Sequence, residues 1–484
     1  MARMMASSPR NPYADRRWAC LGVSATGTFM STLDGGIVNV ALPTIAHRFN
    51  TDLPAAQWVV TIYLLVIVCL LPAFGRLGDM TGRKRKYFLG FLIFALSSAL
   101  CGAAPGLSFL VAGRALQAVG AALLMANGPA IIMMSFPGHE RGRALGMLGM
   151  VVSLGSLAGP SLGGLLVGAF GWPYIFYVNV PIGILGMFLV CRILPADKHP
   201  STERFDFFGA AIYAVGIVSL VMGITHGGTW GWLSPATLGA WILAFGALAF
   251  FVRSQAKSAH PVIDPSLFRI RALTIGNIAS FLSFMALLTN AIMLPFFLQR
   301  VAGLPPMRVG LIMAAQPLAM AFVAPFAGLA SERVSHALLT SVGMALAACG
   351  LYSQTFLTAD STLTHFLLNQ VILGLGFGVF LAPNNNAVLG SAPPAKSGIA
   401  GALMGLVRTL GMVTGIAAAA AVYQTFSGGA MAMDLRNAAA FSRTGFDAAM
   451  TFAAGLAVLG ILVSLARGSA PGPRQGSALD PPGR

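Results

Sequence analysis

The chain has 484 residues, of which 56% are hydrophobic and 9% are charged, whereas ordinary soluble domains carry about 25% charged residues. Together with a mean hydropathy of +0.78, this composition excludes a water-soluble globular fold. A formal net charge of +16 would suit a nucleic-acid binder, but the Lys and Arg residues fall in short runs between long apolar spans. Such runs set the orientation of membrane helices, so we expect a protein of the lipid bilayer that binds no nucleic acid.

A helix that crosses a bilayer needs roughly 20 mostly apolar residues, and the sequence contains fourteen such stretches. Their approximate ranges are 18–44, 56–74, 87–105, 108–134, 143–170, 173–194, 207–225, 236–253, 273–299, 308–330, 337–356, 364–383, 398–424 and 446–466. The predicted fold is therefore an all-α polytopic membrane protein with 14 transmembrane helices.

The distribution of basic residues predicts the orientation. Of the 30 Lys and Arg residues, 23 lie on the side of the chain termini, 5 on the other side and 2 within spans. By the positive-inside rule both termini are cytoplasmic, and we expect a multi-pass protein of the inner (plasma) membrane. The N-terminal tail is predicted at 1–17. The tail 468–484 is rich in Gly, Pro and Ser and is predicted to be disordered.

An internal repeat with an offset close to 253 residues predicts the architecture. The matched sets are Ala41-Leu42-Pro43 with Met293-Leu294-Pro295, Gly75 and Asp79 with Gly328 and Glu332, Gln117 with Gln370, and Gly155 and Gly159 with Gly411 and Gly415. Duplicated helix bundles that meet around a central site are typical of transporters. We expect one six-helix bundle over 18–200, a second over 261–467, and two inserted linker helices within 201–260.

Asp34 is the one carboxylate predicted to lie well inside the hydrocarbon layer, where buried acids are costly and usually functional. It stands nine residues before Pro43, at a depth of roughly 13 Å, and Arg114 lies at a comparable depth in the fourth span. A conformational change that separates the two would alter the proton affinity of the carboxylate. The pair is thus a candidate for proton coupling, and the alternative is a static ion pair that fixes helix packing.

The segment Gly75–Lys86 is predicted to be a loop between the second and third spans. Gly75 and Gly82 would allow tight turns, and Asp79 would pair with Arg83 or cap a helix. Such a charge cluster can hold two helices in one conformation and release them in another. We interpret it as a conformational latch, with a plain basic loop as the alternative.

Small residues dominate the fifth span over 155–164. Close helix packing with a bend at the proline is expected there, and a gating role remains open. The residues concerned are Gly155, Gly159, Pro160, Gly163 and Gly164.

Polar side chains within other spans are candidates for a substrate pocket among many Met and Phe residues, which suit varied apolar ligands. For each of them, hydrogen bonding between helices is the alternative. They are Asn39, Gln117, Asn127, Asn290, Gln316, Gln370 and Arg408. No cofactor is expected and no metal site is predicted.

These motifs resemble the major facilitator superfamily over nearly the whole chain, and within it the fourteen-helix drug:proton antiporters of the multidrug resistance efflux type. The matching stretches are Leu33-Asp34 with Asn39–Pro43, Gly75–Lys86, Arg114 with Gln117 and Gly120, Gly155–Gly164, Trp172–Phe176 with Asn179–Gly183, and Phe205-Asp206 with Gly209. The resemblance implies proton coupling at Asp34 and Arg114, conformational locking at Asp79 and Arg83, and antiport gating at Gly159-Pro160. Some multidrug members of this family that accept divalent cations carry an acid in the thirteenth helix. The span 398–424 has none, so the resemblance does not imply a preference for divalent cationic drugs.

The predicted function is proton-coupled export of small lipophilic compounds by alternating access. The expected partners are that substrate, protons and the lipid bilayer, and we expect a monomer. A dedicated exporter of one endogenous metabolite, or a facilitator or importer of the same fold, remains the alternative. An enzyme or an ATP-driven pump is disfavoured because the sequence has neither HExxH nor GxxxxGK[ST].

Overall fold

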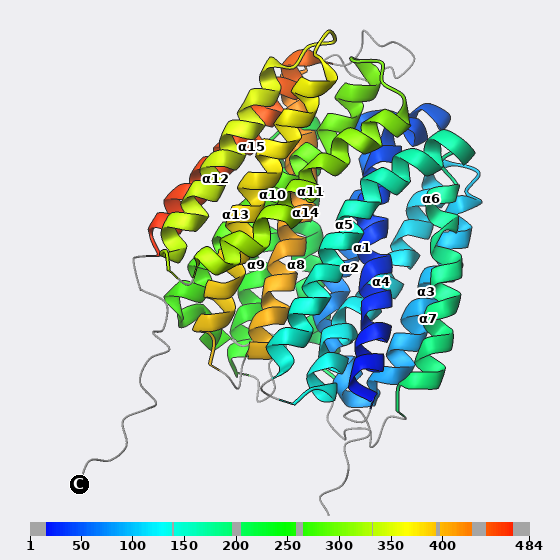
Figure 1. The fold of residues 1–484 in the computed structure, drawn as a ribbon, viewed down its shortest axis with the longest axis vertical. Coiled ribbons are helices and arrows are strands. Elements are labelled where there is room, and N and C mark those ends of the chain that lie inside the picture. Colours follow the sequence, from blue (N-terminus) through cyan, green and yellow to red (C-terminus); the bar gives the residue numbers. More distant parts are fainter. Residues whose placement is uncertain are drawn as a thin grey trace, which may run out of the picture.

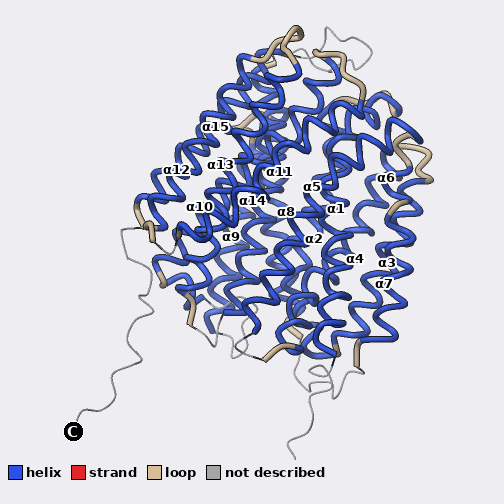
Figure 2. Tube along the Cα trace, viewed as in Figure 1, coloured by secondary structure: helices blue, strands red, loops and turns tan. Residues whose placement is uncertain are grey.

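Fourteen helical spans run side by side along the long axis of the molecule in the computed structural model (Figure 1). The structure describes residues 16–137, 140–195, 205–257, 265–331, 333–393, 397–427 and 442–467, and the tail predicted to be disordered lies outside these ranges. Within them every regular element is a helix (Figure 2). The prediction of an all-α membrane protein with 14 transmembrane helices is confirmed.

The N-terminal half consists of α1 (Arg17–Arg48), α2 (Leu53–Thr81), α3 (Arg83–Gly102), α4 (Leu107–Ser135), α5 (Arg141–Phe170), α6 (Tyr174–Tyr177) and α7 (Asn179–Ile193). The linker helices are α8 (Phe207–Trp230) and α9 (Pro235–Lys257). The C-terminal half consists of η3 (Pro265–Arg269), α10 (Arg271–Arg300), α11 (Pro306–Ala330), α12 (His336–Ser353), η4 (Gln354–Phe356), α13 (Leu363–Ser391), α14 (Ser397–Phe426) and α15 (Arg443–Leu465). The predicted span 173–194 is therefore one crossing made of two helices, α6 and α7.

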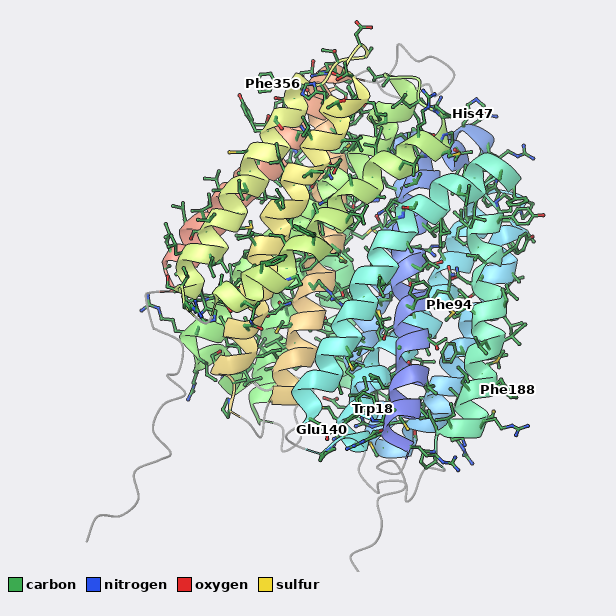
Figure 3. All side chains as sticks on the ribbon, in the orientation of Figure 1. Trp18, His47, Phe94, Glu140, Phe188 and Phe356 are labelled. Atoms are coloured by element: carbon green, nitrogen blue, oxygen red, sulfur yellow. The ribbon has the colours of Figure 1, made fainter. Side chains whose placement is uncertain are left out.

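The two ends of the bundle are distinguished by the direction of the chain. Trp18 and Glu140 lie at the end where α1 begins, and His47 and Phe356 lie at the opposite end (Figure 3). We call the first the terminal face and the second the far face. At the terminal face Arg17 forms an ion pair with Glu140 at 2.8 Å, which joins the start of α1 to the start of α5.

The packing of the helices repeats between the two halves. In the first half α1 packs on α5, α2 on α4, and α3 on both α4 and α7. In the second half α10 packs on α14, α11 on α13, and α12 on both α13 and α15. The halves meet through α5 with α11, α2 with α14, and α1 with α10. This is the two-bundle architecture that the 253-residue offset predicts.

The linker helices α8 and α9 stand outside this repeat. They pack on each other, and α8 also packs on α2 and α14 beside the seam between the halves. Asp206 caps α8 by accepting a hydrogen bond from Gly209 N at 2.8 Å. On α9, Ile242 and Phe245 are 74% and 62% exposed, as expected for apolar side chains that face lipid. The two helices are thus the predicted insertion.

The segment predicted to be a loop is mostly helical, so that prediction is wrong. α2 continues to Thr81 and α3 begins at Arg83, which leaves Gly82 as the one connecting residue. Gly82 has φ +96°, a backbone conformation that glycine adopts without steric strain. Gly75 and Gly78 lie inside α2, and Gly78 instead allows the Asn127 side chain of α4 to contact the α2 backbone.

Candidate functional site

Asp34 of α1 is fully buried and accepts three hydrogen bonds from two other helices. Its Oδ2 accepts from Arg114 Nη1 at 2.5 Å. Its Oδ1 accepts from Gln117 Nε2 and from Asn179 Nδ2, each at 3.0 Å. Ser98 of α3 completes the group, because its Oγ accepts a second bond from Gln117 Nε2 at 2.7 Å. We call Asp34, Ser98, Arg114, Gln117 and Asn179 the carboxylate cluster.

Arg114 connects the carboxylate cluster to α2. Its Nε donates to the Val59 carbonyl oxygen at 2.9 Å, and its Nη1 donates also to Gln117 Oε1 at 2.6 Å. The guanidinium carbon lies 4.0 Å from the centre of the Tyr63 ring, a cation–π contact. Arg114 Nη2 is buried without a hydrogen-bond partner among the described residues. The guanidinium is therefore held by charge, hydrogen bonds and a ring, with one donor left over.

This geometry allows one proton to change the interactions of several helices. An ionised Asp34 binds the guanidinium and two amide donors, whereas a protonated carboxyl would lose the charge and offer a donor where donors already point. Charge pairs removed from water are strong when complete and costly when one member is lost. Protonation of Asp34 would thus weaken the contacts that hold α1 to α4 and α7.

The buried pair predicts a specific pattern of stability. We expect Arg114→Leu to destabilise the protein by about 3 kcal/mol, because it leaves a buried carboxylate unpaired. The double variant Arg114→Leu with Asp34→Leu should recover most of that loss, since replacing both charges with apolar groups is often neutral. Unfolding of the purified variants in detergent would measure both. Equal destabilisation by the single and double variants would contradict the view that the unpaired charge is the cause.

The small residues of α5 form two contact surfaces. A Cβ on Gly159 would lie 2.9 Å from Gly36 Cα, and one on Gly163 would lie 2.8 Å from the Ile37 carbonyl oxygen, so this face packs directly on the α1 backbone. A Cβ on Gly164 would lie 2.6 Å from the Pro306 carbonyl oxygen and 2.9 Å from Gly310 Cα, on α11 of the other half. The predicted packing motif therefore joins α5 to α1 and also to the opposite bundle.

The far face is closed by contacts between the halves. Besides the crossing of α5 with α11, Gln299 Nε2 donates to the Val40 carbonyl oxygen at 3.0 Å, and Arg300 Nη2 donates to that of Pro43 at 3.4 Å. Asp34 lies nine residues along α1 from Pro43, or roughly 13 Å toward the terminal face. The carboxylate cluster thus lies beneath a closed far face.

Four amide side chains form a second buried cluster, in the C-terminal half. Asn290 Nδ2 donates to Gln316 Oε1 at 3.1 Å and to Gln370 Oε1 at 3.4 Å, and Gln354 Nε2 donates to Asn290 Oδ1 at 2.7 Å. We call these four residues the amide cluster. The structure brings together three of the pocket candidates, and Gln354, from the short helix η4, completes the set.

The other pocket candidates lie apart from the amide cluster. Gln117 belongs to the carboxylate cluster, and Asn127 donates to Leu123 O of its own helix at 2.8 Å. Asn39 is buried, and its Oδ1 has no hydrogen-bond partner within the described ranges. Arg408 is half-buried on α14, with its guanidinium carbon 6.0 Å from the centre of the Phe284 ring on α10.

Sequence reasoning did not select Tyr63, Ser98, Asn179 or Gln354 as site residues. Asn179 stands within one of the stretches on which the resemblance rests, but its bond to Asp34 depends on the turn between α6 and α7. The repeat relates one further pair of residues, because Tyr63 and Gln316 are separated by the same 253 residues as Gln117 and Gln370. Tyr63 and Gln316 therefore occupy equivalent positions in the two halves.

Duplicated six-helix bundles, each with buried polar side chains, are typical of polytopic membrane transporters. The model of the Major Facilitator Superfamily matches residues 24–415 and 273–482, and the chain belongs to that family.

Relatives agree with this assignment, and a solved structure shares the fold. "Riboflavin transporter RibZ" of Clostridioides difficile (strain 630) is 36% identical over 403 residues, 83% of this chain and 87% of that protein. "Multidrug resistance protein Stp" of Mycobacterium tuberculosis (strain ATCC 25618 / H37Rv) is 33% identical over 395 residues, 81% of this chain and 73% of that protein. A bacterial homolog of the human lysosomal transporter Spinster, solved inward-facing and unoccupied, superposes with a TM-score of 0.63 at 18% identity, covering 96% of this chain and 100% of that one.

Proposed function

We propose that this transporter is a proton-coupled antiporter that exports small lipophilic compounds across the cytoplasmic membrane. The observation that carries the proposal is the fully buried Asp34, bound to Arg114 at 2.5 Å and to two amides. Burying a carboxylate at this depth costs free energy, and ionisable residues inside the membrane are usually functional. The similarity of the whole chain to a multidrug resistance protein supports export as the direction of transport and lipophilic compounds as the substrates.

The proposed cycle uses the closed far face as one of two end states. With the terminal face assigned to the cytoplasm, substrate enters from there while Asp34 holds no proton. Opening of the far face then releases the substrate, and Asp34 takes up a proton that it later gives to the cytoplasm. The segment with Gly75, Asp79, Gly82 and Arg83 would latch α2 to α3 in one end state, and the glycines of α5 would be the sliding surface.

The energy available from one proton is sufficient for this work. One elementary charge that crosses the membrane releases about 2.3 kcal/mol per 100 mV. A tenfold concentration ratio of a neutral compound costs about 1.4 kcal/mol. A single titrating carboxylate therefore supports useful export of a neutral molecule. In this proposal the protein works as a monomer in the inner membrane, with both termini cytoplasmic and without a cofactor.

Efflux of a lipophilic fluorescent dye from energised cells tests the function. We expect cells that express the wild type to lose the dye faster than cells with an empty vector, and a proton uncoupler should abolish the difference. Efflux that persists after the uncoupler would contradict proton coupling. Accumulation of dye in place of loss would contradict export.

A transporter dedicated to one metabolite is the second candidate. The specific observations that favour it are the 36% identity to a protein named for riboflavin transport and the amide cluster, whose hydrogen-bonding groups suit a polar planar compound. Competition between riboflavin and the dye in the efflux assay separates the candidates. A dedicated transporter would move riboflavin and leave the dye in the cells.

A further inference from the structure

The amide cluster is buried yet incompletely bonded. Asn290, Gln354 and Gln370 are 0% exposed and Gln316 is 5% exposed. Asn290 uses its amide to bond all three partners, which leaves Gln316 Nε2, Gln370 Nε2 and Gln354 Oε1 without a partner among the described residues. A buried polar group without a partner is costly, and native proteins keep such groups mainly where a ligand, an ion or water completes them. The cluster therefore presents two open donor groups and one open acceptor.

The amide cluster is the repeat-related counterpart of the carboxylate cluster. Gln370 stands at the offset of Gln117, and Gln316 stands at the offset of Tyr63. The charged pair itself is missing from this half. The offset of 252 that relates Pro43 to Pro295 places Ala286 where Asp34 would be, and the offset of 253 that relates Gln117 to Gln370 places Leu367 where Arg114 would be. The carboxylate cluster thus holds a charged pair, whereas the amide cluster holds only neutral hydrogen-bonding groups.

The two clusters lie at similar depths beneath the closed far face. Asn290 is ten residues along α10 from Arg300, whose side chain contacts Pro43. That spacing is roughly 15 Å, close to the depth of Asp34. On α11, Gln316 lies six residues from Gly310, or roughly 9 Å toward the terminal face from the crossing with α5. A ligand at the amide cluster would therefore sit below the far-face contacts, among α10, η4, α11 and α13 of the C-terminal half.

We infer that the amide cluster is the hydrogen-bonding site for a neutral, planar substrate group with two carbonyl acceptors and one N–H donor, such as a cyclic imide. Two open Nε2 groups match the two carbonyl oxygens, and the open Oε1 matches the N–H. A neutral group suits the cluster because the cluster carries no charge with which to compensate a buried ion. The inference rests on the proposed function for its substrate, but it concerns binding alone.

Equilibrium binding of a fluorescent imide to the purified protein in detergent tests the inference. The probe is 4-amino-1,8-naphthalimide. The matched ligand is methylated at the imide nitrogen, so it keeps the 4-amino group but lacks the imide N–H donor. We expect the wild type to bind the imide about tenfold more tightly than the N-methyl compound, since a buried acceptor left without a partner costs roughly that much affinity. Gln354→Leu should abolish this discrimination, and Gln316→Leu or Gln370→Leu should weaken binding of both compounds about tenfold.

Asn277→Leu is the matched control, because Asn277 is also a buried amide of α10 and bonds only Leu273 O of its own helix, at 3.0 Å. It should leave both affinities unchanged. Equal affinity of the wild type for the two compounds, or no binding of either, would overturn the inference. Wild-type affinities for both compounds in Gln316→Leu, Gln354→Leu and Gln370→Leu would also overturn it. The unfolding midpoint of each variant and of the Asn277→Leu control shows whether the protein is folded in these measurements. Because no gradient is present, a failure of proton coupling would not alter the result.

Discussion

The variant Asp34→Asn is expected to abolish uphill export while the protein stays folded in the membrane. The asparagine side chain retains the size of the carboxyl group and one oxygen that can accept from Arg114, but it cannot take up or release a proton. Without proton exchange the inward and outward forms have no coupling to the proton gradient. Dye efflux against a gradient should fall to the level of cells without the transporter, and counterflow exchange of dye at equal concentrations should remain measurable.

The matched control is Asp360→Asn, which changes an exposed carboxyl in the turn before α13 and should leave efflux unaffected. Asp34→Asn leaves the buried Arg114 guanidinium without its counter-charge, so a loss of stability in detergent is expected. Efflux is therefore compared between cells that hold equal amounts of folded wild type, Asp34→Asn and Asp360→Asn in the membrane. If Asp34→Asn still concentrates dye across the membrane, the coupling role of Asp34 is wrong.

The variant Gly164→Val is expected to reduce transport at least about tenfold by preventing closure of the far face. The added Cβ would meet the Pro306 carbonyl oxygen and Gly310 Cα, which are backbone atoms that cannot rotate away. Separating two close-packed helices by even one methyl group costs roughly 1–3 kcal/mol, enough to shift a two-state balance by about tenfold. Transport rate and labelling of a cysteine placed at Gln299 would measure the change. The exposed Cys191 and Cys349 would first be replaced, so that only the introduced cysteine is labelled from solution.

Labelling from the far side should rise in Gly164→Val, since position 299 lies against Val40 of α1 in this structure and separation of the two helices would uncover it. Gly168→Ala is the control on the same helix, because its Cβ would lie 3.6 Å from Met307 Cβ, an ordinary contact. Reduced transport without a rise in labelling would show that the substitution acts on something other than far-face closure.

Much of the architecture could be predicted from one-dimensional patterns. The length and spacing of the apolar stretches determined the number of crossings, because each stretch must satisfy its backbone hydrogen bonds within a single helix in lipid. The 253-residue offset predicted two bundles and an insertion, and the packing of α8 and α9 outside the repeat agrees. Asp34 stood out because a charge in hydrocarbon is rare, and the contact with Arg114 that the sequence allowed is present at 2.5 Å.

Other features were decided by the tertiary structure. Gly75–Thr81 is helical in the structure, and its Gly78 packs against the Asn127 side chain of α4, a contact that the sequence does not reveal. Asn179 bonds Asp34, and Ser98 bonds Gln117, because α7 and α3 turn those faces inward. Gln354 reaches Asn290 from a short helix between two crossings. Hydrophobicity along a membrane helix records that the helix is in lipid, but it carries little information on rotation about the axis. That rotation is set by small-residue packing and polar contacts between helices, and these exist only once the bundle has formed.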